Sequence, residues 1–295
     1  MVTKEINELP IARVKGEKAK AFVQLLKLRL SLLVSFSAVF GFAMASGTWG
    51  WGLFWIGFGG LLVTGASNVL NQILEREYDA QMKRTSQRPL PTGVLSDLEA
   101  LAYALVLAVV GVGIIGYFFN LPAALLSIIG LLVYAFVYTP LKRITPFCVF
   151  VGAIPGGLPP LIGWVAFTGS IGPEGLLLFA FQFFWQFPHF WAIAWMLDDD
   201  YQRAGFVMLP SSKGKTKFSV QMILIYTLCL VPLVYFAWET GIVGLGGTIA
   251  LVVLGLAFSW PAFRLFRTLE GKYAKQLMFA SFLYLPLIQL AFLLG

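Results

Sequence analysis

Residues 53–70 read LFWIGFGGLLVTGASNVL and pass without a break into NQILEREYD at residues 71–79. The first stretch is long and apolar enough to lie in a lipid bilayer. In the second, Asn71, Glu75 and Asp79 recur every four residues, so on a helix they share one face. Carboxylates at the mouth of a membrane helix are costly unless they hold a cation or line a wet cavity. The sequence therefore predicts a membrane helix that ends in a cation site.

A basic segment, MKRTSQRPLPTG at residues 82–93, follows this acidic motif directly. The guanidinium groups of Arg84 and Arg88 can fork onto phosphate oxygens. Three other cations of the predicted loops add positive charge: Lys83, Lys142 and Arg143. Because Mg²⁺ prefers oxygen ligands and often bridges carboxylates to substrate phosphates, the pattern predicts a Mg²⁺–diphosphate site at the membrane boundary.

Two further cations, Lys27 and Arg29, stand at the start of the first apolar run. They either join the diphosphate site or extend to the lipid headgroups, as long basic side chains at membrane boundaries do. The sequence alone leaves both interpretations open.

Composition indicates one broad class of protein. Of the 295 residues, 59% are hydrophobic and 12% are charged, and the mean hydropathy is +0.82. This balance excludes a soluble domain and indicates an integral membrane protein. The single His and the two Cys exclude a His-rich metal site and a disulfide framework. The net charge of +7 lies where it sets membrane topology, so we expect no nucleic-acid partner.

Hydropathy predicts an all-α protein with nine transmembrane helices. The predicted spans are 26–46, 52–74, 98–119, 121–139, 146–168, 174–196, 218–238, 243–263 and 276–294. All 21 Lys and Arg lie at or before the start of the first span or in alternate connections, which places the N-terminus and those connections in the cytoplasm.

The N-terminal segment lacks the apolar core of a secretory signal and carries acidic residues that a mitochondrial transit peptide would avoid. We therefore expect a multi-pass protein of a bacterial inner membrane, embedded in the lipid bilayer. We divide the chain into a polar cytoplasmic segment, residues 1–24, and a single membrane domain, residues 25–295.

A second acidic motif, Asp198-Asp199-Asp200-Tyr201, ends the sixth predicted span and precedes a basic segment at 203–217. Three adjacent carboxylates repel one another unless a cation balances them. On a helix they cannot all point one way, so we expect one or two to face a site and the rest to face water. Two acid-tipped helices on the same membrane face indicate one composite site.

The fifth and sixth spans carry unusual residues for membrane helices. The fifth holds Pro155, Pro159 and Pro160 among several glycines, which predicts a kinked or broken segment that either makes room for a flat substrate or packs closely on neighbours. The sixth is rich in aromatic residues, which either pack or stabilise a carbocation. His189, in the same span, either contacts a substrate or makes a structural hydrogen bond.

Together these motifs resemble those of the UbiA superfamily of intramembrane prenyltransferases. The acidic stretch 71–79, followed by Met82-x-Arg84-Thr85-x-x-Arg88-Pro89-Leu90, is similar to the first signature of that family. Other similar segments follow in the family's order: 138–146, 157–164, 185–190 and 200–210. The Pro188-His189 pair and the segment from Tyr201 to Pro210 favour the heme-modifying branch over the quinone and chlorophyll branches.

The resemblance implies nine helices around a central cavity, with a prenyl diphosphate held through Mg²⁺ by the two acidic motifs. In the heme branch, farnesyl diphosphate reacts with a vinyl group of heme b to give the hydroxyethylfarnesyl group of heme O. Heme O then serves terminal oxidases, directly or through heme A, so heme A synthase or terminal oxidase assembly is an implied partner.

The resemblance also assigns roles to residues of this chain. The implied metal ligands and catalytic residues are Asn71, Glu75, Asp79 and Asp200, and Lys142 completes the catalytic set. The implied substrate contacts are Arg29, Lys83, Arg84, Arg88, Arg143, Tyr138, His189, Asp199 and Tyr201. Two departures leave the number of metal ions open. Glu75 replaces the usual Asp of the first motif, and Met196 and Ala204 stand where a second Asp, four residues from Asp200, is often found.

Three other functions share parts of this pattern. A quinone-type prenyltransferase shares the metal site, a small transporter shares the spans and the intramembrane polar groups, and a heme chaperone shares the heme contacts. The acidic residues gather at one membrane face, whereas a transporter more typically has its site near the midplane. Holding heme without chemistry requires no diphosphate site.

Overall fold

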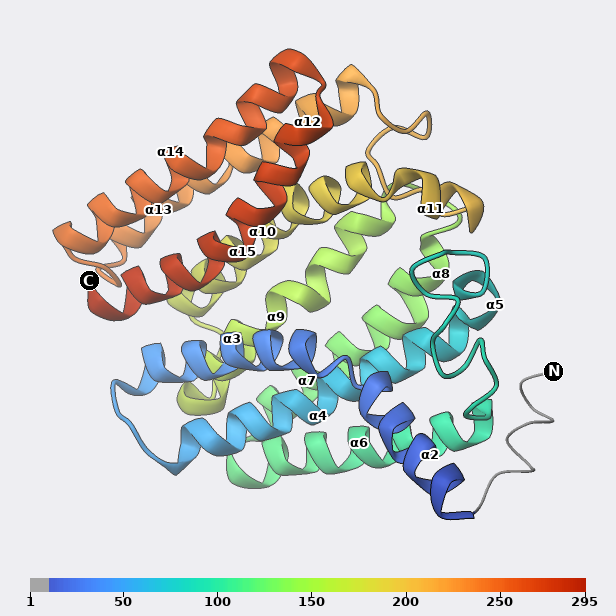
Figure 1. Ribbon diagram of the computed structural model, residues 1–295. Coiled ribbons are helices and arrows are strands. Elements are labelled where there is room, and N and C mark those ends of the chain that lie inside the picture. Colours follow the sequence, from blue (N-terminus) through green and yellow to red (C-terminus); the bar gives the residue numbers. More distant parts are fainter. Residues whose placement is uncertain (1–10) are drawn as a thin grey trace.

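The computed structural model describes residues 11–295, and in that range the chain forms helices and no strands (Figure 1). Nine of these helical segments are long and apolar enough to cross a membrane, which confirms the predicted count within the described residues. The spans are α3 (Leu28–Ser46), α4 (Trp51–Leu74), α6 (Asp97–Phe118), α7 to α8 (Leu121–Leu141), α9 (Cys148–Thr168), α10 (Pro173–Met196), α12 to α13 (Lys217–Glu239), α14 (Leu245–Thr268) and α15 (Gly271–Leu294).

The predicted boundaries hold to within two residues for most spans, but the last two helices are longer than expected. Helix α14 continues to Thr268 and α15 begins at Gly271, so the basic residues of this connection lie on helices. The guanidinium carbon of Arg264 lies 4.9 Å from the centre of the Tyr273 ring, which stabilises the charge at the end of the helix pair. The hydropathy of a loop and of a helix end that carries such side chains is similar, so hydropathy placed the end of α14 too early and the start of α15 too late.

The spans form two packed halves joined by α9 and α10. One buried cluster is built mainly on α3, α4, α6, α7 and α9, and the other mainly on α9, α10, α12, α13, α14 and α15. Helices α9 and α10 pack against each other and are the most buried of the nine spans. In contrast, α6 is the least buried, as expected for a helix that faces lipid on most of its surface.

Of the two predicted forms of the fifth span, kinked or broken, the structure excludes the broken one, because helix α9 runs from Cys148 to Thr168 without interruption. Pro160 has no N–H to donate to the carbonyl of Gly156, and the side chain of Gln182 on α10 donates to that carbonyl instead, at 2.8 Å. A Cβ on Gly163 would overlap the backbone of α3 at Ala38. The Pro- and Gly-rich sequence of α9 therefore supports close helix packing.

The connections that carry the acidic motifs meet at one end of the bundle. Three short helices gather there (Figure 1): α5 (Arg76–Asp79), α8 (Thr139–Leu141) and α11 (Asp198–Arg203). A six-residue π-helix, η1 (Val133–Tyr138), leads into α8. Helix α2 (Ile11–Leu25) precedes the first span and lies beside α4 and α6 (Figure 1). The predicted segment 1–24 is described only from residue 11 onward.

Candidate active site

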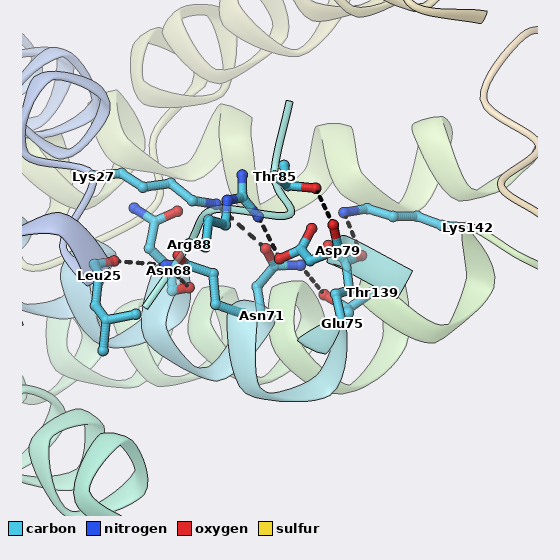
Figure 2. A network of polar contacts seen from close by, with 11 residues as sticks. Leu25, Lys27, Asn68, Asn71, Glu75, Asp79, Thr85, Arg88, Thr139 and Lys142 are labelled. Carbon is cyan, nitrogen blue, oxygen red and sulfur yellow. Dashed lines mark hydrogen bonds and ion pairs between the residues drawn. The ribbon is translucent and has the colours of Figure 1, made fainter. Parts of the chain in front are cut away.

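The first acidic motif is buried at the junction between α4 and α5. Asn71 belongs to the last turn of α4, Glu75 joins the two helices, and Asp79 ends α5. Their exposed fractions are 2%, 4% and 0%. The backbone N–H of Asp79 donates to the carbonyl of Glu75 at 2.7 Å, so the helical spacing continues across the junction. All three side chains therefore enter one network, as predicted (Figure 2).

Each residue of the motif meets a cation from a different part of the chain (Figure 2). The Arg88 guanidinium lies 2.6 Å from Oδ2 of Asp79, and Nζ of Lys142 lies 2.7 Å from Oε1 of Glu75. Lys27 Nζ donates to Oδ1 of Asn71 at 3.4 Å. Figure 2 shows Lys27 and Lys142 extending toward the motif from opposite sides. Three cations thus surround two carboxylates and one carboxamide.

Lys27 reaches this network because of an unusual backbone conformation. It lies between α2 and α3 with φ 47° and ψ 52°, in the left-handed region that favours glycine. Such a conformation in a lysine costs about 1 kcal/mol or more, and it recurs at functional sites. Burial, together with the nearby charges of Arg88 and Lys142, lowers the pKa of Lys27 to about 7. An anion beside Lys27 would stabilise its charged form.

Lys142 differs from Lys27 in its electrostatic environment. Burial is the largest single effect and disfavours its charge, but the attraction of Glu75, the nearby Tyr138 and Tyr134 and the hydrogen bond to Glu75 together outweigh it, so the pKa of Lys142 is raised above its usual value. Its ammonium also lies 4.6 Å from the centre of the Tyr138 ring. Lys142 therefore keeps its positive charge at the site over the physiological pH range.

The second acidic motif contributes one buried carboxylate, that of Asp200. Its two oxygens accept hydrogen bonds from the backbone N–H groups of Lys83 and Arg84, at 3.2 and 3.3 Å. Arg203 pairs with the same carboxylate. Asp200 thus ties α11 to the basic segment that follows the first motif.

The two neighbouring aspartates point elsewhere. The side chain of Asp199 is 90% exposed and lies 3.8 Å from Nζ of Lys215. Asp198 is half-buried and accepts a hydrogen bond from Gln202 at 3.0 Å. Only one of the three aspartates, Asp200, is therefore buried against the basic segment.

The predicted substrate contacts divide into residues near the network and residues at its edge. Arg88 belongs to the network, and Tyr138 is buried beside Lys142. Arg143 is exposed and its guanidinium lies 4.2 Å from the centre of the Tyr78 ring, while Tyr201 packs 6.2 Å from Phe206. Besides Arg143 and Asp199, three further predicted contacts are exposed: Arg29, Lys83 and Arg84.

His189 lies deeper in the bundle, on α10. Its Nδ1 lies 2.7 Å from the hydroxyl oxygen of Ser281 on α15, and the Ser281 hydroxyl donates its one proton to the carbonyl of Met278 at 2.6 Å. The His189 Nδ1 therefore carries a proton, and Nε2 presents a lone pair. Within residues 11–295, no hydrogen bond reaches that Nε2.

The aromatic residues of α10 mostly contact one another. Phe183 packs against Phe179 and Phe187, with ring centres 5.5 and 5.2 Å apart, and Phe187 packs against Tyr226 at 4.3 Å. Trp185 stacks on His189 at 4.7 Å. These contacts support the packing interpretation for most of the aromatic run.

The first motif offers oxygen ligands that suit a hard cation. In the described part of the chain, no three His, Cys, Asp or Glu side chains gather closely enough to bind a metal ion without other ligands. However, Oδ1 of Asp79 is buried and has no hydrogen-bond partner among these residues, and Oδ1 of Asn71 points toward Lys27. Since Mg²⁺ keeps several waters and takes further oxygens from a bound phosphate, this partial ligand set fits it.

Two features of the site were missed by the choice of substrate contacts from the sequence. Lys27, and not Arg29, enters the network, although the sequence had singled out both. Thr139 contacts Asn71, and Thr85 donates to the backbone carbonyl of Asp79 at 2.8 Å. The only signal for both threonines was their place within the family-like segments.

Comparisons with known proteins find a matching family model and similar sequences. The model of the UbiA prenyltransferase family matches residues 34–285. The chain is 43% identical over 277 residues to the protoheme IX farnesyltransferase of Cytophaga hutchinsonii, an alignment that covers 93% of this chain and 97% of that protein.

Solved structures show the same fold at lower identity. A structure of digeranylgeranylglyceryl phosphate synthase has a TM-score of 0.79 at 21% identity and covers 95% of this chain and 98% of that one. A UbiA homolog from Archaeoglobus fulgidus, bound to GPP and Mg²⁺, has a TM-score of 0.68 at 14% identity, with 93% and 100% coverage.

Proposed function

The chain belongs to the UbiA prenyltransferase family, and from this premise we propose that it transfers the farnesyl group of farnesyl diphosphate to heme b. The acceptor is a vinyl group of the heme, the product carries the hydroxyethylfarnesyl group of heme O, and diphosphate is released. The alignment with a protoheme IX farnesyltransferase along nearly its whole length supports this acceptor over a quinone precursor.

The observation that carries the proposal is the buried charge network at the end of α4. Arg88 and Lys142 direct two positive charges toward one motif, and Lys27 adds a third when a nearby anion stabilises its charged form. Only two carboxylates, Glu75 and Asp79, offset them there. A diphosphate group, with its several negative charges, is an anion that such a network would bind strongly.

The oxygen ligands of the site are proposed to hold Mg²⁺. Asn71, Glu75 and Asp79 would supply them from the first motif, and Asp200 would supply one from the second. When bound, Mg²⁺ neutralises negative charge that develops on the diphosphate leaving group. Within residues 11–295, Oδ2 of Asp200 accepts a single hydrogen bond, from the backbone N–H of Arg84, and so keeps a lone pair for a metal contact.

The cations of the chain act on the same leaving group. As the bond between the farnesyl C1 and the diphosphate oxygen breaks, the electron pair stays on the oxygen and negative charge grows there. The charges of Arg88 and Lys142, together with that of Lys27 in its protonated form, stabilise this charge in a largely water-excluded site. The farnesyl unit becomes an allylic cation.

The terminal carbon of the heme vinyl group then attacks the farnesyl C1 and forms the new carbon–carbon bond. The positive charge moves to the vinyl carbon next to the porphyrin ring, where water adds and loses a proton. This sequence gives the hydroxyethylfarnesyl group. Neither of the first two steps needs a strong general base, in keeping with a site built from cations and metal ligands.

His189 is proposed to contact the heme. Its hydrogen bond to Ser281 leaves Nε2 with a lone pair, which can accept a hydrogen bond or bind an iron ion. The residue lies seven positions before the end of α10 at Met196, about 10 Å into the bundle at 1.5 Å per residue. A heme beneath the diphosphate would lie at that depth.

The location of the site also remains a proposal. The segregation of Lys and Arg supports a cytoplasmic N-terminus and a cytoplasmic site mouth, in a bacterial inner membrane. In that arrangement residues 25–295 form one prenyltransferase domain. Heme A synthase or a terminal oxidase would receive the product.

The proposed function is tested by mass spectrometry of the porphyrins extracted after the purified protein is incubated with heme b, farnesyl diphosphate and Mg²⁺. The expected product is hydroxyethylfarnesyl heme, absent when EDTA removes the cation. Farnesylation of a quinone precursor in place of heme would move the chain to another branch of the family. An absence of any prenyl transfer by folded protein would overturn the proposal.

A further inference from the structure

Thr139 lies where the π-helix η1 passes into α8, next to the first acidic motif. Pro140 follows it and provides no N–H, and a proline ring collides with the carbonyl four residues earlier, which displaces the regular α-helical pattern. The local turn is wider, so the backbone N–H of Thr139 donates to the carbonyl of Tyr134, five residues back. Such π-helical turns are frequent at functional sites.

The hydroxyl group of Thr139 has a fixed hydrogen-bonding role in this turn. It donates its only proton to the same Tyr134 carbonyl, at 2.9 Å. Toward any other group the hydroxyl can therefore only accept. The group that it meets is the side chain of Asn71, 3.1 Å away (Figure 2).

This fixed role determines which way the carboxamide of Asn71 points. The atom beside Thr139 must be the NH₂ group, since only NH₂ can donate to the hydroxyl oxygen. The other atom is then Oδ1, which accepts from Lys27 at 3.4 Å. The Thr139 hydroxyl and the Lys27 ammonium therefore both favour the same orientation of the carboxamide. Asn71 and Thr139 are buried, so water does not compete for these bonds.

We infer that Thr139 is a positioning residue that holds the Asn71 carboxamide with its oxygen toward the cation site. The inference rests on the proposed function, in which Asn71 is an oxygen ligand of Mg²⁺. If the amide turned over, its NH₂ group would face the cation, and a ligand would become a repulsive group. The hydroxyl of Thr139 disfavours that orientation, because it would have to give up its bond to the Tyr134 carbonyl in order to donate to Oδ1.

The competing explanation is that the bond only packs η1 against α4. Both explanations predict some loss of stability when the hydroxyl is removed. They differ in the cation dependence of substrate binding, because a packing bond has no reason to change the affinity for Mg²⁺ specifically.

The test measures how much Mg²⁺ the purified protein needs to bind farnesyl thiodiphosphate, an unreactive analogue of farnesyl diphosphate, by calorimetric titration. Thr139→Val should raise the Mg²⁺ concentration at half-maximal binding by roughly tenfold, about 1.4 kcal/mol. Thr139→Ser keeps the hydroxyl and should stay within about twofold of the unchanged protein, since the methyl group plays no part in the orientation.

Thr227 provides a matched control on α12. It is buried, and its hydroxyl donates to the Ile223 carbonyl of its own helix at 2.7 Å, the only hydrogen bond of that side chain within the described residues. Thr227→Val makes the same chemical change away from the site and should leave the Mg²⁺ requirement unchanged. An equal shift in Thr227→Val and Thr139→Val would overturn the inference.

A double-mutant cycle separates orientation from packing. Asn71→Asp replaces the carboxamide with a carboxylate, which presents an oxygen in either orientation. Thr139→Val should therefore shift the Mg²⁺ requirement far less in the Asn71→Asp background than in the natural protein. An equal shift in both backgrounds would show a packing role and overturn the inference.

The outcomes also distinguish this inference from the proposed function. If the unchanged protein binds the analogue without any dependence on Mg²⁺, the proposed cation site fails and the inference fails with it. If the unchanged protein requires Mg²⁺ and folded Thr139→Val has the same requirement, only the inference fails. Should Thr139→Val not fold, a folded Thr139→Ser variant with a strongly raised requirement would contradict it equally.

Discussion

The two acidic motifs have similar charge but differ in how their side chains are used. In the first, Asn71, Glu75 and Asp79 are all buried and each meets a different cation. In the second, Asp200 alone is buried, and Asp199 faces solvent. Spacing explains the difference, because residues four apart on a helix share a face and adjacent residues diverge. The position of a carboxylate on the helix, and not the density of acidic residues, marks the site.

The largest effect should follow a change in the first motif at Asp79. Asp79→Asn keeps an oxygen that can accept from Arg88 but removes the negative charge that the proposed cation needs. We expect kcat to fall by at least about 10³-fold, the upper range for loss of one electrostatic contact in a water-excluded site. Product formation is measured by chromatography of extracted heme, with melting temperature as the control for folding. Turnover above one tenth of normal would contradict the assignment.

A smaller loss should follow the corresponding change in the second motif. Asp200→Asn retains an acceptor oxygen for only one of the N–H groups of Lys83 and Arg84, and it weakens the contact with Arg203. We expect kcat/KM to fall by roughly 10- to 100-fold, within the range for one charge-assisted hydrogen bond of about 1.5–3 kcal/mol. The same heme assay measures it. A loss of activity as large as that in Asp79→Asn would contradict the expectation that the first motif contributes more to turnover than the second.

The cations at the mouth of the first span give a third test. Lys27→Met should raise KM for farnesyl diphosphate by roughly tenfold, since its ammonium lies in the network, an effect of about 1.4 kcal/mol. Arg29→Met, two residues away and exposed, should leave KM within about twofold. Steady-state kinetics at saturating heme separates KM from kcat. Equal effects in the two variants would mean that the left-handed backbone at Lys27 does not favour Lys27 over Arg29 as the contact to the diphosphate.

The smallest effect is expected at Asp199. Its carboxylate is exposed and its contact with Lys215, at 3.8 Å, is a surface ion pair. Such pairs contribute about 0–1 kcal/mol, so Asp199→Asn should keep kcat/KM within about twofold. A loss of tenfold or more in the heme assay would show that the second motif uses more than one carboxylate.

The fold and the first motif could be predicted because both depend on local periodicity. Apolar length determines the spans, and four-residue spacing brings Asn71, Glu75 and Asp79 to one face. The rest depends on contacts between distant segments. Lys27 adopts a left-handed backbone conformation, which a glycine would usually signal in a sequence, and no glycine stands at that position. In helix α9, the Gly156 carbonyl accepts a hydrogen bond from Gln182 of α10 in place of the missing N–H of Pro160. The sequence of α9 alone cannot reveal this partner.

The central claim is that the first motif forms a Mg²⁺–diphosphate site. It is tested most directly by a structure of the protein with farnesyl thiodiphosphate and Mn²⁺, which locates the metal by its anomalous scattering. The account predicts the metal bound to Oδ1 of Asp79 and Oδ1 of Asn71, with Lys27 and Arg88 on the diphosphate oxygens. A diphosphate bound elsewhere, with the ion pair between Arg88 and Asp79 intact and no metal beside it, would contradict the account.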